Sequence, residues 1–442
     1  MICSCPIRST RGPVLDPRTA LHRARPQVMN FPLSGVLGGH AIRFDAAGRL
    51  APWTTWSTAL EREMEFYQQC PADGGYPRFA YVTFLDSEWT PIADRTDTIP
   101  ATQIGMGIVS YLKFYDWRGK RDVRFLRSAC AMGDYLVREA LTPDAGRYPR
   151  FTRSTGKRDQ FPLAADAGSQ GDRPFEIEPD KGGVAGFALL MLFEAAGGTP
   201  YLAQALQNAR VLATTQADGD AARSPWPFRA DHRTGEGRGV VSGNMTYILR
   251  LYDGLVAQGY GEFAKARAAL WTWILHHQIP SAAGGGELFA QFFEDHETPT
   301  NRSAWAPLNL ARYLLERRGA LDSEWLAHAG MLIDFVQKNF THPEFGITVC
   351  HEQDEDKEAW GGINATYGAV LAMYAAATGS ASLSQVARLA LNFTLYSIDD
   401  RGRPRDLWKN AAPGGWQEDA HTDVIHNYLD ALRAFPDWAD AL

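Results

Sequence analysis

Residues 182–196, GGVAGFALLMLFEAA, decide the fold, because this stretch is almost entirely apolar and rich in small side chains. A helix without a polar face has to be covered on all sides by the rest of the protein. Five other stretches share this character, and the six start at residues 98, 182, 243, 303, 363 and 421. The last four spacings are 61, 60, 60 and 58 residues, which indicates a repeated unit with one stretched copy at the beginning.

A second kind of segment alternates with the enclosed kind. It has apolar residues three and four positions apart and a charged opposite face, which predicts helices that are covered on one side only. These segments are residues 55–69, 121–140, 200–216, 262–277, 324–339 and 382–396. The turns from an enclosed to an exposed helix are short, as in AGGTP at residues 196–200. We therefore predict an all-α protein of six helical pairs with an inner and an outer layer.

The connections in the other direction are long and should all emerge at one end of the assembly. They span roughly residues 70–97, 142–181, 217–242, 278–302, 340–362 and 397–420. Several contain an aromatic residue followed by proline, as in GYPRF at 75–79 and RYPRF at 147–151, which predicts extended backbone in short strands or loops. Connections of this length are uncommon in compact domains unless they are functional.

Six helical hairpins in two layers, with long, Trp-rich and acidic connections before the inner helices, resemble the six-hairpin (α/α)6 toroid superfamily. The resemblance covers residues from about 50 to 436 and rests on the period and the layer pattern. It implies a ring with a cleft formed by the long connections, and a carbohydrate-active enzyme: a glycoside hydrolase, a polysaccharide lyase or a uronyl C5-epimerase. We expect residues 1–50 to form a partly irregular N-terminal extension and residues 51–442 to form the toroid catalytic domain.

The composition argues against two classes of partner. With 51 acidic and 44 basic residues and a net charge of −7, the chain has no positive surplus to neutralise a nucleic-acid backbone. No run of 18 apolar residues occurs, so we expect no membrane partner.

The chain has five cysteines, Cys3, Cys5, Cys70, Cys130 and Cys350. Their small, odd number and wide scatter are typical of a reducing compartment and predict a cytoplasmic protein. The pair Cys350-His351 matches part of the zinc site of lanthionine cyclases, but the upstream cysteine of that site is missing. We therefore expect neither a metal nor a cofactor. The Arg-rich N-terminus lacks the apolar core of a secretory signal, and Met29 is a second candidate for the translation start.

Acidic residues gather just before the inner helices, where free N–H groups and the helix dipole also favour them as caps. Cleavage of a glycosidic bond needs two carboxyl groups, one as acid and one as base or nucleophile. In a ring of hairpins, the two would come from different hairpins. The candidates are Asp97, Glu178, Asp180 and Asp419, each within a few residues of an inner-helix start. His421, at the last of these starts, is either a proton-transfer residue or a cap.

The same connections carry side chains suited to sugars. Indole rings offer flat apolar faces, and guanidinium groups offer directional hydrogen bonds to hydroxyls or carboxylates. The candidate substrate-binding residues of these two kinds are Arg78, Trp89, Arg150, Trp226, Arg229, Trp305, Trp360, Trp408 and Trp416.

A local signature occurs twice, as NMTY at residues 244–247 and NATY at residues 364–367. Lyases and epimerases of uronic acids abstract the proton next to a carboxylate, which requires a base such as Tyr or His and a neutralising Arg or Asn. The candidates for this chemistry are Asn244, Tyr247, Asn364 and Tyr367. The alternative interpretation is that Asn-x-Thr-Tyr is a repeated packing and capping unit.

The sequence thus favours an enzyme that acts on an oligosaccharide or polysaccharide, as a monomer or a homodimer. Glycoside hydrolysis by paired carboxylates is the leading hypothesis, and uronate elimination or C5-epimerisation is the alternative. A third hypothesis is a non-enzymatic helical-repeat scaffold that binds protein partners. Scaffolds of that kind have short and uniform turns, whereas the connections here are long, aromatic and individually different.

Overall fold

The computed structural model describes residues 35–69, 100–154, 175–293, 298–344, 346–404 and 421–442, together with residue 173 and five short strands elsewhere. These five strands are β5 (Ala72–Asp73), β6 (Tyr76–Pro77), β7 (Thr83–Leu85), β8 (Pro91–Asp94) and β14 (Trp416–Glu418).

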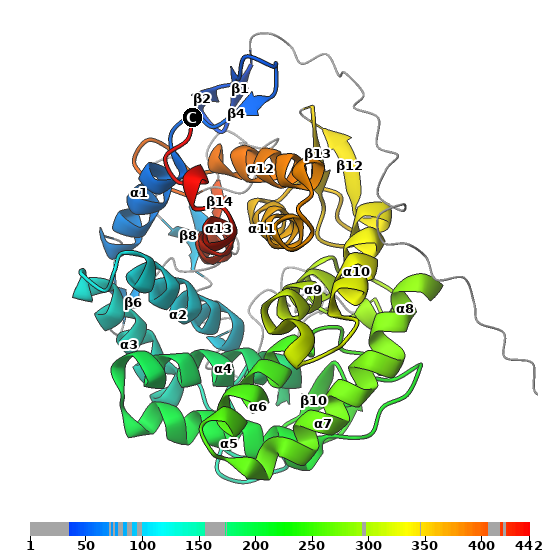
Figure 1. Cartoon of the computed structure of the whole chain (residues 1–442). Coiled ribbons are helices and arrows are strands. Elements are labelled where there is room, and N and C mark those ends of the chain that lie inside the picture. The colour runs from blue at the N-terminus through cyan, green and yellow to red at the C-terminus, as the bar shows by residue number, and fades with distance from the viewer. Residues whose placement is uncertain are drawn as a thin grey trace, which may run out of the picture.

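Six helices form the inner layer, and they correspond to the six enclosed stretches of the sequence. They are α2 (Pro100–Trp117), α4 (Pro179–Ala196), α6 (Thr246–Ala257), α9 (Trp305–Arg317), α11 (Gly361–Thr378) and α13 (His421–Ala434). Each contacts the next one along the chain, and α13 packs against α2, so the layer closes into a ring (Figure 1). The predicted (α/α)6 toroid is therefore confirmed.

The outer layer consists of the predicted amphipathic helices. They are α1 (Trp56–Gln69), α3 (Val123–Arg138), α5 (Thr199–Thr215), α7 (Ala264–Trp273), α8 (Ile279–Gly284), α10 (Trp325–Asn339) and α12 (Ala381–Leu395). A π-helical turn, η3 (Ile274–Gln278), joins α7 to α8, so this outer helix runs further than the predicted 262–277. Pro280 in the first turn of α8 has no N–H to donate, and the wider π turn precedes it. Short 3₁₀ turns are η2 (Gly261–Phe263), η4 (Glu287–Phe289), η5 (Arg318–Ala320) and η6 (Pro436–Trp438).

Glycines in the most apolar stretch allow neighbouring inner helices to approach closely. A Cβ atom at Gly183 would lie 2.5 Å from Cγ1 of Ile248, and one at Gly186 would lie 2.6 Å from Cδ2 of Leu251. Both contacts are shorter than packed carbon atoms tolerate. The small residues of α4 are therefore needed for its contact with α6.

The two ends of the chain together make the sixth helical pair. The rings of Trp56 on α1 and Tyr428 on α13 meet edge to face with centroids 4.9 Å apart. The backbone N–H of Ser57 donates to the carbonyl of Ala439 at 2.9 Å. The hairpins β1 (Val36–Leu37) with β2 (His40–Ala41) and β3 (Arg43–Phe44) with β4 (Leu50–Ala51) precede α1. Asn392 of α12 ties this segment down by donating to the carbonyl of Leu50 at 2.9 Å.

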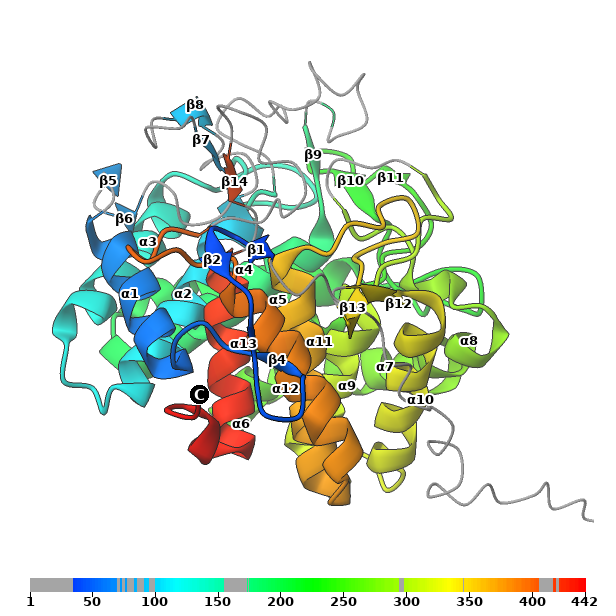
Figure 2. The same cartoon turned by 90° about the horizontal axis from the view of Figure 1, so that it is seen from above.

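The long connections meet at one end of the ring, which we call the loop end. Strand β14 pairs with β7, which joins the last connection to the first. Strand β9 (Glu176–Ile177) pairs with β10 (Arg229–Asp231), and β10 pairs with β11 (Gly237–Arg238), which joins the second connection to the third. The fifth connection holds the hairpin of β12 (Thr341–Glu344) and β13 (Ile347–Cys350). Figure 2 shows β7–β11 and β14 gathered over one end of the helices, as the sequence predicts.

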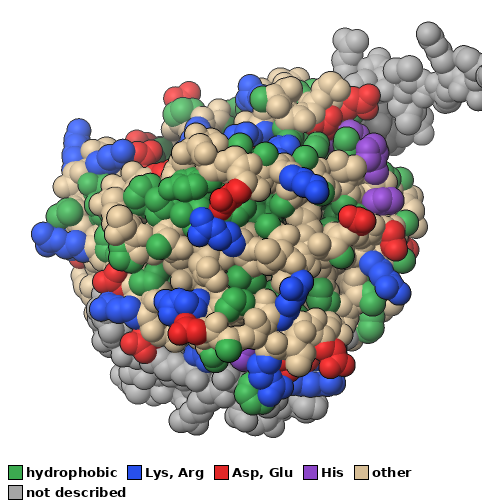
Figure 3. Space-filling view, turned by 90° about the horizontal axis from the view of Figure 1, so that it is seen from below, with side chains coloured by type: hydrophobic (Ala, Val, Ile, Leu, Met, Phe, Trp, Pro, Cys, Tyr) green, Lys and Arg blue, Asp and Glu red, His purple; other side chains and the backbone are tan. Residues whose placement is uncertain are grey.

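The outer surface carries charges of both signs. On the face shown in Figure 3, Lys and Arg side chains are interspersed with Asp and Glu. Exposed pairs such as Arg210 with Glu262, at 2.9 Å, contribute little stability individually. Within the described part of the chain, no helix is both long and apolar enough to span a membrane.

Candidate functional site

The start of α4 brings a carboxylate and a guanidinium together below the loop end. Ile177 pairs with Ala230 across β9 and β10, and this register places Glu178 opposite Arg229. Oε1 of Glu178 lies 3.4 Å from Nε of Arg229, and both side chains are at most 1% exposed. The Glu178 side chain makes no capping hydrogen bond to its own helix. The capping interpretation is therefore wrong for Glu178, whose carboxylate is directed at Arg229 instead.

A second buried pair lies two residues further along. Asp180 is in the first turn of α4, and its Oδ2 lies 3.6 Å from Nζ of Lys181. Nζ of Lys181 also donates to the carbonyl of Phe292 at 2.8 Å and lies 4.1 Å from the centroid of the Phe292 ring. We call Glu178, Asp180, Lys181 and Arg229 the α4 cluster. Its charges are costly to bury and are held in pairs, as buried charges must be.

An aromatic stack extends from this cluster across the next hairpins. The ring of Phe292 is parallel to that of Trp305, with an interplanar angle of 1° and centroids 6.4 Å apart. Trp305 begins α9, and its Nε1 donates to Oε1 of Glu352 at 3.1 Å. The contacts therefore run from α4 through the start of α9 to the connection before α11. The structure thus connects Asp180 with Trp305 through Lys181 and Phe292, and the Glu178–Arg229 pair lies two residues from Asp180 at the same helix start.

Trp360 lies at the start of α11, where it is the N-cap residue and half-buried. Its Nε1 donates to Oδ2 of Asp356 at 2.8 Å. This hydrogen bond fixes the indole at the loop end, one inner helix beyond Trp305.

Trp226 was predicted to bind substrate, and the structure contradicts this prediction. Its side chain is fully buried in the main hydrophobic core, and its Nε1 donates to Oγ1 of Thr215 at 3.1 Å. Phe228, two positions on, is also buried. An indole enclosed in the core cannot stack against a sugar.

The second copy of the repeated signature is structural. Asn364 accepts from the backbone N–H of Cys350 and donates to its carbonyl, both at 2.8 Å. The hydroxyl of Tyr367 accepts from Gln337 on α10 at 3.1 Å. The predicted substrate-binding roles of Asn364 and Tyr367 are therefore wrong, and the packing interpretation holds for them.

The first copy sits differently, because α6 begins two residues after Asn244 whereas α11 begins three residues before Asn364. Asn244 is buried, and among the described residues its Oδ1 has no hydrogen-bond partner. Tyr247 faces a cavity that opens at the opposite end of the ring. Burial raises the pKa of Tyr247 to about 12, which opposes a role as general base near neutral pH.

Arg150 lies on the surface rather than in the α4 cluster. Its NH1 lies 3.1 Å from Oδ1 of Asp144, and more than half of its side chain is exposed. The predicted role of Arg150 in binding substrate stays a prediction.

The remaining candidates lie outside the described residues or are described by backbone alone. Arg78, Trp89, Asp97, Trp408 and Asp419 are outside the described residues. Trp416 lies in β14 and His421 begins α13. The roles of these residues stay predictions.

Sequence reasoning missed Lys181, Phe292 and Glu352. Lys181 had a visible signal, since it is a charged residue at the border of the most apolar stretch of the chain. Phe292 and Glu352 had none, because they reach the site only through the approach of two separate connections. In the described part of the chain, no three His, Cys, Asp or Glu side chains cluster in a way that could hold a metal ion.

Solved structures with the same fold include enzymes that process sugars. A sugar epimerase from a ruminal bacterium superposes with a TM-score of 0.62 at 12% identity, covering 85% of this chain and 98% of that one. A D-mannose isomerase superposes with a TM-score of 0.62 at 13% identity, covering 85% of this chain and 97% of that one. A family 76 glycoside hydrolase from a bovine Bacteroides thetaiotaomicron strain superposes with a TM-score of 0.59 at 11% identity, covering 87% of this chain and 78% of that one.

No protein-family model matches the sequence, and no curated protein matches it. At these identities, the structural likeness shows the fold. A shared fold does not by itself establish a shared function. The chain has the (α/α)6 toroid fold seen in epimerases, hydrolases and a lyase that act on carbohydrates.

Proposed function

We propose that the chain is a carbohydrate-active enzyme whose substrate binds over the start of α4, at the loop end. One observation carries the proposal: the four charged side chains of the α4 cluster are each at most 1% exposed. Buried charges cost stability, and such clusters concentrate at catalytic and ligand-binding sites. The adjoining aromatic stack supplies the flat apolar surface that suits a sugar ring.

Glycoside hydrolysis is the leading reaction. It needs one carboxyl group as acid and a second as base or nucleophile on opposite sides of the bond. In our proposal Glu178 or Asp180 supplies one of them, and Asp97 or Asp419 supplies the other from a different hairpin. The guanidinium of Arg229 beside Glu178 suits the ionised member of the pair, because it balances the carboxylate charge.

Proton abstraction from a uronic acid is the second candidate, and the cations of the α4 cluster favour it. Lys181 and Arg229 have the charge to neutralise a substrate carboxylate and so stabilise the charge that develops after proton loss. His421 is the sequence candidate for the base. Solved structures of this fold include both sugar epimerases and a polysaccharide lyase.

A panel assay on the full chain tests these alternatives. Neutral and uronate-containing polysaccharides are incubated in D₂O, and three signals are read: new reducing ends, ultraviolet absorbance of an unsaturated uronate, and deuterium at a sugar carbon. Hydrolysis produces reducing ends only, elimination produces reducing ends and absorbance, and epimerisation produces deuterium incorporation with neither of the others.

The variant Glu178→Gln links any activity to the proposed site. We expect it to lose activity, while the matched variant Asp134→Asn, on the outer surface of α3, keeps it. Absence of all three signals together with absence of glycan binding would contradict a carbohydrate-active function.

A further inference from the structure

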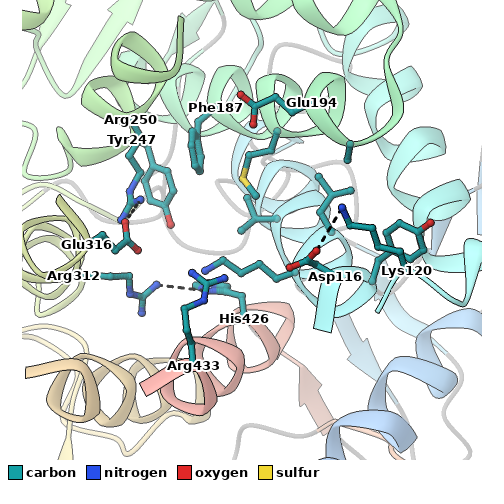
Figure 4. Close-up of a pocket in the computed structure, with 16 residues that line it drawn as sticks. Asp116, Lys120, Phe187, Glu194, Tyr247, Arg250, Arg312, Glu316, His426 and Arg433 are labelled. Carbon is teal, nitrogen blue, oxygen red and sulfur yellow. Dashed lines mark hydrogen bonds and ion pairs between the residues drawn. The ribbon is translucent and has the colours of Figure 1, made fainter. Parts of the chain in front are cut away.

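A cavity of about 400 Å³ opens at the end of the ring opposite the loop end, which we call the cavity end. Its lining comes from the later turns of α2, α4, α9 and α13, together with two residues of α6 (Figure 4). The volume lies in the range of small-molecule sites. Nothing in the proposed function uses this cavity.

One wall of the cavity is apolar and aromatic. It includes Phe187 and Met191 of α4 and Tyr247 of α6. Tyr247 also packs with Met106 and Val184 in a small apolar cluster of its own, separate from the main core. Met106 and Val184 lie nearer the inner-helix starts than the lining residues of their helices, so this cluster packs behind Tyr247 on the side of the loop end.

The rest of the lining carries more cations than acids. The cationic lining residues are Lys113, Lys120, Arg250, Arg312 and Arg433, and the acidic ones are Asp116, Glu194 and Glu316. Arg250 pairs with Glu316 at 2.5 Å, and Lys120 pairs with Asp116 at 3.6 Å. Asp430 lies behind this part of the lining, 2.8 Å from Nζ of Lys113 and 3.7 Å from Nε of Arg312.

Arg433 differs from the other cations of the lining. Among the described residues it has no ion-pair or hydrogen-bond partner, and its side chain is exposed. Figure 4 shows it extending from α13 toward His426 and the centre of the cavity. Its guanidinium keeps its donors available for an anion, and a guanidinium matches a carboxylate or phosphate with paired hydrogen bonds.

The cations of the lining act on the buried groups in the deep part of the cavity. Burial lowers the pKa of His426 well below its ordinary value, and the charges of Lys113 and Arg312 lower it further. Burial also lowers the pKa of Lys113, and repulsion from Arg312 adds to this despite the attraction of Asp430. Both groups therefore hold a proton less readily than they would in water, and a bound anion would relieve that cost.

We propose that the cavity binds a small organic anion with a flat apolar body. The anionic group pairs with Arg433 and faces Lys113 and Arg312, and the apolar body lies against Phe187 and Tyr247. Carboxylates and phosphate esters share this chemistry. The site lies at the other end of the ring from the α4 cluster, so this proposal does not depend on the proposed function.

Calorimetric titration of the full chain tests the proposal with three probes of one shape: naphthyl phosphate, naphthoate and the neutral naphthol. We expect at least one of the two anions to bind more tightly than naphthol by about tenfold or more, since a charge-assisted contact contributes that much. Added salt should weaken the binding of the two anions and leave the binding of naphthol unchanged. The stronger of the two anions identifies the head group as phosphate or carboxylate.

Two variants locate the site. Arg433→Gln removes the exposed cation, and Met191→Trp fills the apolar part of the cavity. Each substitution should raise the dissociation constant of the anion by about tenfold or more. Arg138→Gln is the matched control, because Arg138 is also an exposed arginine in the last turn of its helix but lies on the outer layer. Equal binding of naphthol and the anions, no binding of any probe, or binding that neither variant changes would overturn the proposal.

Discussion

Buried charges are paired differently at the two ends of the ring. At the loop end, the pairs gather at one helix start: Asp180 and Lys181 form a local pair of sequence neighbours, and Glu178 meets Arg229 of the next connection across a short strand pair. At the cavity end, the pairs join different inner helices, as Lys113 of α2 does with Asp430 of α13.

Helix direction explains part of this difference. The positive ends of the inner-helix dipoles meet at the loop end and the negative ends at the cavity end. Asp180 in the first turn of α4 and Arg433 in the last turn of α13 follow that polarity. Local pairs can be built by one helix start, whereas pairs between helices exist only once the ring has closed. The comparison therefore predicts that variants at the cavity end act on stability and variants at the loop end act on activity.

Asp430→Asn is expected to have the largest effect. It leaves the buried cations Lys113 and Arg312 without their shared carboxylate, and breaking a buried pair costs about 3–5 kcal/mol of unfolding free energy. Urea denaturation measures this loss, and activity per folded molecule should stay within about twofold. Asp116→Asn is the control, since its exposed pair with Lys120 contributes about 0.5 kcal/mol. Equal stability of the two variants would contradict a buried network.

Asp180→Asn is expected to lower kcat by about 100-fold or more, as loss of an acid–base group does. It should also lower the melting temperature, because Lys181 loses its carboxylate partner. The double variant Asp180→Asn with Lys181→Met separates the two effects: stability should recover and activity should not. Full activity in the single variant would remove Asp180 from the catalytic candidates.

Acid should lower the unfolding free energy through groups at both ends of the ring. One buried histidine at each end allows the two contributions to be measured separately. Burial, with Lys357 and His342, lowers the pKa of His351 at the loop end to about 4. In the unfolded chain this histidine takes up a proton near pH 6.5, so between pH 6.5 and 4 the unfolded state binds more protons and stability falls as the pH falls. Burial and the charges of Lys113 and Arg312 lower the pKa of His426 at the cavity end well below its ordinary value, so its contribution to stability also falls as the pH falls below 6.5.

Denaturation series against pH check this expectation. His351→Gln should flatten the dependence of unfolding free energy on pH between 6.5 and 4, and His426→Gln should flatten it as the pH falls below 6.5. An unchanged slope in both variants would show that other groups govern acid stability.

Two tryptophans give the smallest and most specific contrast. Trp226→Phe should lower unfolding free energy by about 1–3 kcal/mol through the lost hydrogen bond and packing, with KM unchanged. Trp305→Phe breaks the hydrogen bond to Glu352 and should raise KM several-fold for the substrate found in the panel assay. A rise in KM for Trp226→Phe, with none for Trp305→Phe, would reverse the assignment of the two indoles.

The helical layers could be predicted from sequence because the signal is local. Apolar residues three to four positions apart, or apolar residues all round, report on one helix at a time. The fourth outer helix exceeded its predicted end at residue 277 only because a π turn continues it into α8. The α4 acids were found for the same reason, since helix starts favour acids wherever they occur.

The candidate site was predicted less completely, because tertiary packing separates residues that look alike in sequence. Trp226 and Trp305 both lie beside predicted inner helices and both are buried, yet the indole of Trp226 donates to Thr215 and that of Trp305 donates to Glu352 and stacks on Phe292. Asn244 and Asn364 belong to the same four-residue signature, yet α6 and α11 begin at different positions relative to it.

The sequence by itself determined the twelve-helix alternation, the single end at which the long connections emerge, and the carboxylates at the start of α4. Each of these follows from periodicity or helix polarity, which act over a few residues. Only the tertiary structure decided that Arg229 faces Glu178, that Phe292 reaches Lys181, and that a basic cavity opens at the opposite end. Those contacts join residues of separate hairpins, so they depend on how the closed ring brings the hairpins together.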